Sequence, residues 1–193
     1  WDKGFDVVPG AVRRLLAQRT DVRFVIQLHR AEKHAATVEA RALLRELAHL
    51  HPGRVELVEG HLPPEEYSRV LQACDVVAIP YRAESYGLGT SGVCAEAVGA
   101  GRWTVVPADT WMAMQQHVYR RVSVFHHHTG EAVAAAINAS LLHLATTPHD
   151  AYLDAEVQAW RKFHDAATWL DVVERAVAEV LDPRGYPPDS PSA

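Results

Sequence analysis

Short apolar runs alternate along the chain with longer segments of helical periodicity, and this alternation constrains the fold most strongly. The runs are rich in β-branched residues and cover residues 22–28, 55–58, 76–81, 104–107 and 122–125. The helical segments cover residues 8–18, 35–50, 63–73, 91–100, 131–144 and 157–181. Short buried runs of this kind are typical of central parallel strands. The order therefore predicts an α/β fold with a doubly wound parallel sheet and right-handed crossovers.

The length of 193 residues suits one such domain, which we expect over residues 1–182. Residues 183–193 are rich in Pro, Ser and Gly and predict a disordered tail. A doubly wound domain usually opens with a strand, whereas this chain enters its first helix almost directly. Either a strand lies ahead of Trp1, or the sheet begins with residues 22–28. Because the chain has no initiator Met, we interpret it as a fragment or a processed form.

Composition excludes several classes of protein. The net charge is −5, and the sequence contains no run of Lys and Arg that could contact a nucleic-acid phosphate backbone. We therefore expect no nucleic-acid partner. The sequence predicts no transmembrane segment and no signal peptide. Cys74 and Cys94 both lie in apolar runs, which favours buried free thiols in a reducing, cytoplasmic compartment.

The segment from Tyr81 to Ser91 is the best candidate for a binding loop. Open parallel sheets bind ligands beyond the carboxyl ends of their strands, and this long loop follows a predicted strand. Thr90 or Ser91 can cap the next helix, and Gly92 leaves its first turn without a side chain. Unpaired amides and the helix dipole would then suit a phosphate. The alternative interpretation is a plain capped helix after a flexible loop.

Glu96 lies on the same predicted helix among small apolar neighbours. A carboxylate in such surroundings needs a partner, and a pair of ribose hydroxyls is a good one. The alternative is an ion pair with Arg102.

Two other patterns favour structural roles. Adjacent side chains on an extended segment point to opposite faces, so His126, His127 and His128 do not predict a metal site. Trp160, Phe163 and Trp169 recur at helical spacing and predict a packing face rather than a ligand site.

Several segments resemble one known family in the right order, from Trp1 to about Leu181. Residues 86–107 resemble the donor-site motif of GT-B glycosyltransferases of the large "group 1" type, with a Gly-containing loop, a helix bearing Glu-Ala, a Gly and a strand. Residues 3–6 (Lys-Gly-Phe-Asp) resemble the Lys-Gly segment ahead of the first donor-domain helix. Residues 55–60, 65–67 and 73–77 resemble the strand, Gly, helix and Ala-Asp-Val pattern of the same domain.

The resemblance implies a C-terminal, Rossmann-like domain that binds a nucleotide-diphosphate sugar as donor substrate, with no further cofactor and no metal. An N-terminal domain ahead of Trp1 would hold the acceptor, whose kind the motifs do not define. This chain alone would then bind nucleotide but transfer sugar poorly.

The resemblance also implies residue roles. Lys3 would clamp the diphosphate, and Glu96 would bind the ribose; these two are the candidate catalytic residues. The remaining candidate binding residues lie in the loop and first turn around the phosphates or in the nucleobase pocket: Tyr86, Gly89, Thr90, Ser91, Gly92 and Val93 in the first group, Gly60 and His61 in the second.

The sequence departs from the family pattern at three places. Leu88 stands where the family often has a Glu, Arg102-Trp103 replaces the usual Lys-Pro, and residues 28–30 replace a Gly-rich turn. Two alternatives therefore stay open: a nucleotide-sugar 2-epimerase-like enzyme, and a non-catalytic nucleotide-binding or scaffolding module.

Overall fold

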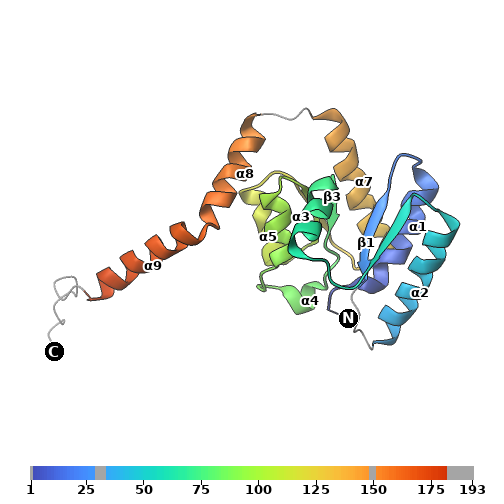
Figure 1. Cartoon of the computed structure of the whole chain (residues 1–193), viewed down its shortest axis with the longest axis horizontal. Helices are drawn as coiled ribbons and strands as arrows, with labels where there is room; N and C mark the ends of the chain where they lie inside the picture. Colours follow the sequence, from blue (N-terminus) through green and yellow to red (C-terminus); the bar gives the residue numbers. More distant parts are fainter. Residues whose placement is uncertain (1, 29–33, 148–150, 182–193) are drawn as a thin grey trace.

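The computed structural model of the chain describes residues 2–28, 34–147 and 151–181 (Figure 1). The tail predicted over residues 183–193 lies outside these described residues, as does most of the 28–30 departure.

Every strand pair in the described part of the chain is parallel, which confirms the predicted α/β class. β1 (Phe24–Leu28) pairs with β2 (Val55–Glu59) in one sheet. β3 (Val76–Ala78), β4 (Trp103–Pro107) and β5 (Val122–Phe125) form a second sheet in the order β3-β4-β5. The strands therefore form two adjoining parallel sheets, where the sequence predicted one. The first described strand is β1, and the chain reaches α1 (Val8–Gln18) through a short 3-10 helix, η1 (Phe5–Val7).

The remaining helices connect the strands or follow the last of them, and some of them cover each face of the three-stranded sheet (Figure 1). They are α2 (Ala35–Leu50), α3 (Pro64–Ala73), α4 (Ala83–Tyr86), α5 (Gly92–Gly99), α6 (Trp111–Met114), η2 (Gln115–His117), α7 (Gly130–Thr146), α8 (Ala151–Phe163) and α9 (Ala166–Leu181). The short helices α4 and α6 were not predicted, since a single turn carries too few residues to show a period.

β4 is the central strand, and its two faces belong to two different cores. All five of its residues are buried. Val105 packs with α1 and α7 residues such as Leu15 and Val133. Val106 packs on the opposite face with α5, α6 and α8 residues such as Val98 and Trp160. Successive side chains of a strand point to opposite faces, so one strand holds both helix layers in place.

A third core lies between the two-stranded sheet and its helices. Leu16 of α1 and Leu44 of α2 pack there against Ile26 and Leu28 of β1. α1 therefore contributes one face to each of two cores and ties the two sheets together.

The C-terminal helical segment differs from the prediction. Residues 157–181 were predicted as one helix, but two helices meet at His164 and Asp165, where the Asp165 carboxylate accepts a hydrogen bond from the Thr168 amide at 3.3 Å. An Asp in that position caps a new helix, which ends the first one. Trp160 is buried, but Phe163 is 74% exposed, so the predicted packing face is only partly right.

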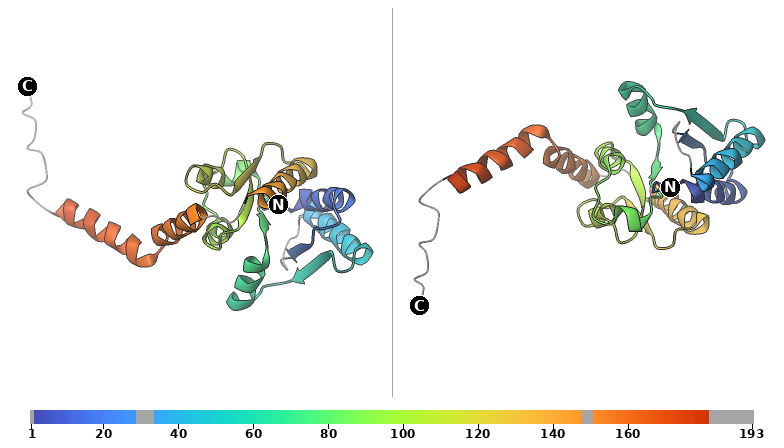
Figure 2. Two further views of the ribbon diagram at one scale, coloured as in Figure 1. Left: turned by 90° about the horizontal axis from the view of Figure 1, so that it is seen from above. Right: turned by 90° about the horizontal axis from the view of Figure 1, so that it is seen from below.

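α9 extends away from the body of the molecule (Figure 2). No helix among the described residues has the length and apolar character needed to cross a membrane.

Candidate functional site

The N-terminus of α5 lies at the carboxyl edge of the three-stranded sheet. The chain leaves β3, passes through α4 and enters α5 at Gly92. The Ser91 hydroxyl caps the helix by accepting a hydrogen bond from the Cys94 amide at 3.3 Å, and Ser91 itself is buried. A side chain at Gly92 would meet no other atom within 4 Å. The predicted cap is therefore confirmed, and the first turn is open to solvent.

The loop before α5 is held by its own backbone. The Gly89 amide donates to the Tyr86 carbonyl oxygen at 2.6 Å, and the Trp111 amide donates to that of Gly87 at 2.6 Å. Leu88 is 89% exposed at the tip of this loop. Thr90 is exposed beside Ser91, whereas Val93 is half-buried and packs against the core below.

Lys3 reaches the same loop from the start of the chain. Its Nζ lies 4.2 Å from the ring centroid of Tyr81 and 4.7 Å from that of Tyr86, and it donates a hydrogen bond to the Tyr86 hydroxyl. Burial alone would lower the pKa of Lys3, but the hydrogen bond to Tyr86 and the influence of Tyr81 outweigh it. The pKa of Lys3 is therefore raised, and the ammonium stays charged at neutral pH.

Asp6 joins this segment to two loops at the carboxyl edge. Its carboxylate accepts a hydrogen bond from the Arg82 guanidinium at 2.7 Å and lies 3.3 Å from Nε2 of His128. The Arg82 amide also donates to the Asp2 carbonyl oxygen at 2.9 Å. His128 is thus engaged by a carboxylate, and no group of potential metal ligands is found within the described ranges.

Glu96 contacts a tyrosine rather than the arginine that the sequence offered as an alternative. The Tyr67 hydroxyl of α3 donates to Oε2 of Glu96 at 2.7 Å. Burial, and next the hydrogen bond to Glu96, raise the pKa of Tyr67 well above its usual range. The Arg102 guanidinium instead donates to the carbonyl oxygens of Ala100 and Cys74. Glu96 is itself exposed, so its carboxylate can reach a ligand.

Gly60 and His61 lie at the carboxyl end of β2, in the other sheet. Gly60 has a φ of +86°, and its amide donates to the Leu28 carbonyl oxygen at 2.9 Å. His61 is exposed and immediately precedes the segment that leads into α3. Because Tyr67 of α3 contacts Glu96, α3 connects this pair of residues with the α5 side of the site.

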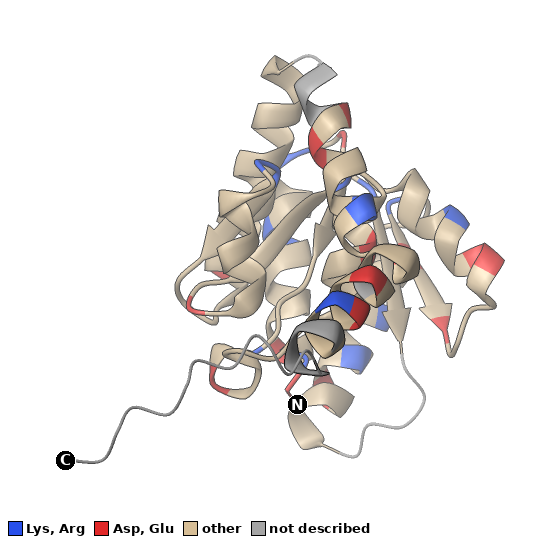
Figure 3. Cartoon of the chain, turned by 90° about the vertical axis from the view of Figure 1, so that its left-hand side faces the viewer, with Lys and Arg blue, Asp and Glu red and all other residues tan. Residues whose placement is uncertain are grey.

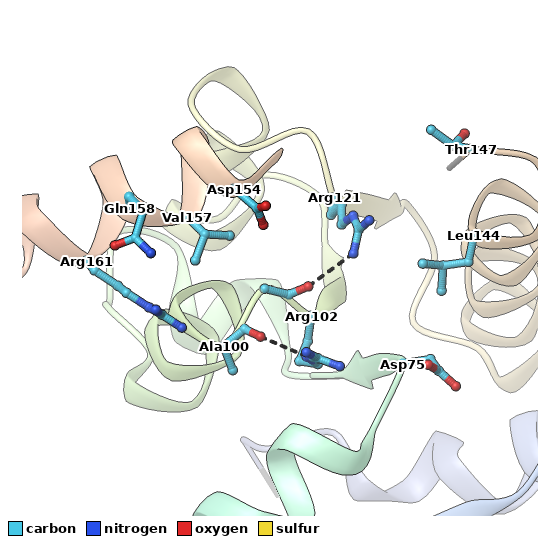
Figure 4. A pocket seen from close by; sticks show the side chains of 11 residues that line it. Asp75, Ala100, Arg102, Arg121, Leu144, Thr147, Asp154, Val157, Gln158 and Arg161 are labelled. Atoms are coloured by element: carbon cyan, nitrogen blue, oxygen red, sulfur yellow. Dashed lines mark hydrogen bonds between the residues drawn. The ribbon is translucent and has the colours of Figure 1, made fainter. Parts of the chain in front are cut away.

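A cavity of about 430 Å³ lies at the opposite, amino edge of the sheet (Figure 4). Arg102, Arg121 and Arg161 line it, and they donate to the carbonyl oxygens of Ala100, Gly101 and Gly99 respectively. These guanidinium groups stabilise the C-terminal end of α5. We therefore assign the cavity a structural role and place the candidate site at the N-terminal end of the same helix.

Positions of Lys and Arg are interspersed along the ribbon with positions of Asp and Glu (Figure 3). With a net charge of −5, the attraction of an anion to this protein must come from local groups. Lys3 and the N-terminus of α5 supply such groups at the carboxyl edge.

The fold is that of one Rossmann-like half of a GT-B glycosyltransferase. Sucrose-phosphate synthase from Thermosynechococcus elongatus superposes with a TM-score of 0.65 at 18% identity, over 93% of this chain and 43% of that one. The UDP-forming α,α-trehalose-phosphate synthase from Burkholderia xenovorans superposes with a TM-score of 0.66 at 16% identity, over 92% of this chain and 41% of that one. WaaG, a glycosyltransferase involved in lipopolysaccharide biosynthesis, superposes with a TM-score of 0.57 at 18% identity, over 94% of this chain and 44% of that one.

This chain spans about two fifths of the length of these solved structures. No protein-family model matches the sequence, and no curated protein matches it significantly.

The sequence analysis missed Tyr67 and Tyr81. Tyr67, Val70 and Leu71 are the half-buried residues of α3, and their spacing of three and four places them on one helix face. That spacing is visible in the sequence and could have singled out Tyr67 as an inward-facing hydroxyl.

Proposed function

We propose that this chain is the donor-binding half of a GT-B glycosyltransferase and binds a nucleoside diphosphate sugar at the start of α5. One observation carries the proposal: an uncovered helix N-terminus at Gly92 lies at the carboxyl edge of a parallel sheet, with Glu96 one turn further along the same helix. The likeness of the fold to GT-B enzymes supports it.

The diphosphate would bind at the first amides of α5. The first amides of a helix have no acceptor within it, and Ser91 Oγ takes that of Cys94. The Gly92 and Val93 amides would therefore donate to phosphate oxygens, as helix N-termini commonly do. Lys3 would add a full positive charge by turning from the Tyr86 hydroxyl toward the phosphates.

The nucleoside would extend from there toward α3. The Glu96 carboxylate would accept hydrogen bonds from the ribose hydroxyls. Gly60 and His61 would border the nucleobase, because the α3 helix that follows them contacts Glu96 through Tyr67.

In sugar transfer, the bond between the anomeric carbon and the diphosphate oxygen breaks, and the diphosphate leaves with the electron pair. Lys3 and the α5 amides would stabilise the charge that develops on it. An acceptor hydroxyl, held by a part of the enzyme outside this chain, would form the new bond and lose its proton. This chain is accordingly proposed to bind the donor rather than to transfer sugar alone.

Calorimetric titration tests the proposal with UDP, ADP and GDP and with UDP-glucose, ADP-glucose and GDP-glucose. We expect one nucleoside diphosphate to bind, and Glu96→Ala to weaken it by roughly ten- to a hundredfold, since bonds to a charged group contribute about 1.5–3 kcal/mol each. Glu46→Ala is the matched control, because it removes an exposed carboxylate from α2, and it should leave the affinity unchanged. Melting curves would show that both variants are folded. Equal affinity of the parent and a folded Glu96→Ala variant, or no binding of any of the nucleotides, would overturn the proposal.

A further inference from the structure

The contact between Tyr67 and Glu96 joins two helices at the candidate site. The phenol of Tyr67 is half-buried on α3 and bonds to one oxygen of an exposed carboxylate on α5. None of the residues of α3 is buried, whereas α5 buries Cys94, Ala97 and Val98, so α3 is packed less firmly than α5. A hydrogen bond of 2.7 Å to a carboxylate oxygen is short and stronger than one between neutral groups, so it restrains both side chains.

We propose that Tyr67 is a positioning residue that fixes the Glu96 carboxylate for a vicinal diol, and so makes this site select ribose over deoxyribose. The inference rests on the proposed function and goes beyond it by naming the group that confers sugar selectivity.

The geometry of acceptors and donors supports this role. An ionised carboxylate has about four acceptor positions on its two oxygens, and Tyr67 occupies one of them on Oε2. Oε1 and the rest of Oε2 stay available to two hydroxyl groups. The phenol donates a hydrogen bond to Oε2 of Glu96, which orients the carboxylate before a ligand arrives.

Selectivity follows from this orientation. A free Glu side chain loses rotamer entropy when it binds a diol, whereas a side chain already held by Tyr67 loses less. A 2′-deoxyribose offers one hydroxyl fewer, so part of an ordered acceptor stays unmatched. Without the phenol, the carboxylate can turn to accept a hydrogen bond from a single hydroxyl or from water. The affinities for the ribose and deoxyribose forms then become more similar.

The test compares each nucleoside diphosphate with its 2′-deoxy form, using UDP, ADP and GDP in calorimetric titrations. We expect the parent to bind the ribose form at least tenfold more tightly. Tyr67→Phe should reduce this preference to about threefold or less, mainly by weakening the binding of the ribonucleotide. Tyr119→Phe is the matched control, because it removes a hydroxyl that donates to the Arg102 carbonyl oxygen away from the site.

The outcomes separate the inference from the proposed function. If none of the nucleotides binds, the proposed function fails. If a ribonucleotide binds and Tyr67→Phe lowers the melting temperature with no change in the ribose preference, Tyr67 only tethers α3 to α5 and the inference fails alone. Tighter ribonucleotide binding by Tyr67→Phe would also overturn it, since the phenol would then occupy the position of the sugar.

Discussion

Gly4 packs directly against the backbone of Pro80: a β-carbon at Gly4 would lie 1.6 Å from the Pro80 carbonyl oxygen. Gly4 also has a φ of +62°, which side chains other than hydrogen rarely tolerate. This close approach brings the first residues of the chain, Lys3 included, to the carboxyl end of β3.

Gly4→Ala should therefore destabilise the protein more than a substitution at another glycine with positive φ. Gly53→Ala is the control, because Gly53 has a φ of +79° and a β-carbon there would meet no other atom within 4 Å. Both variants lose about 1–2 kcal/mol to backbone strain, and Gly4→Ala loses roughly 1–3 kcal/mol more to overpacking. Urea unfolding of the two variants measures the difference. Equal losses would show that the Gly4 segment is not packed against Pro80.

Asp6→Asn should loosen the same segment by breaking its ion pair with Arg82. Both side chains are largely buried, at 22% and 19% exposure, so the loss should be about 1–3 kcal/mol in the free energy of unfolding. Glu56→Gln is the control, because its ion pair with Arg23 spans 3.6 Å between exposed side chains and should contribute under about 1 kcal/mol. Comparable losses in the two variants would argue against a structural role for Asp6.

Much of the fold was predictable because local patterns decide it. The helices expected over residues 8–18 and 35–50 become α1 and α2 with unchanged bounds, since each carries a regular apolar face. The break between α8 and α9 was not predicted, because the apolar period continues across it and only the Asp165 cap marks the new start. The division into two sheets depends on strand pairing between distant segments, which periodicity does not report.

The candidate site was predictable in its backbone but less so in its side-chain partners. The Ser91 cap and the place of Glu96 follow from spacing along one helix. The partner of Glu96 does not, because Tyr67 lies 29 positions away and meets it only through the packing of α3. Likewise, the contact of Lys3 with Tyr86 joins residues 83 positions apart.

Cys94 should resist alkylation in the folded protein. Its side chain is fully buried, and burial raises the pKa of the thiol to about 12 from 9.0. The thiolate fraction at pH 8 is then lower by roughly a thousandfold than in the unfolded chain. The raised pKa means that the folded protein favours the neutral thiol of Cys94. The contribution of this thiol to the free energy of unfolding is therefore full below about pH 9 and is lost as the pH rises through about 12.

Iodoacetamide labelling at pH 8, followed by mass spectrometry, measures this protection. Cys74 is half-buried and should react first, although burial raises the pKa of its thiol as well. In urea both cysteines should react at similar rates. Labelling of Cys94 as fast in the native protein as in urea would contradict the buried environment.

Ser91→Ala should separate helix capping from ligand binding when it is compared with Thr129→Ala. Both residues cap a helix, with hydrogen bonds of 3.3 Å for Ser91 in α5 and 3.1 Å for Thr129 in α7. Each substitution should cost about 0.5–2 kcal/mol of stability. Only Ser91→Ala should weaken the binding of pyrophosphate, by several-fold, because only α5 holds the proposed phosphate site. Equal pyrophosphate affinities in the two variants would place the phosphates elsewhere.

Lys3→Ala should weaken the binding of nucleoside diphosphates more than that of the corresponding monophosphates. The Lys3 ammonium stays charged beside Tyr81 and Tyr86, at the loop that leads to the α5 N-terminus. A second phosphate group brings more negative charge to this ammonium, and hydrogen bonds to charged groups contribute about 1.5–3 kcal/mol. The affinity for UDP, ADP or GDP should therefore fall by roughly ten- to a hundredfold, and that for UMP, AMP or GMP by less than threefold.

Lys162→Ala provides the control for this experiment, because it removes the same charge from an exposed position near the end of α8. Its diphosphate affinity should match that of the parent at every salt concentration. The parent should lose affinity as salt rises, and Lys3→Ala should lose less, because screening acts on a charge that the variant lacks. Parallel salt dependences for the parent and Lys3→Ala, or equal losses for monophosphates and diphosphates, would show that Lys3 only packs on Tyr81 and Tyr86 and does not contact the diphosphate.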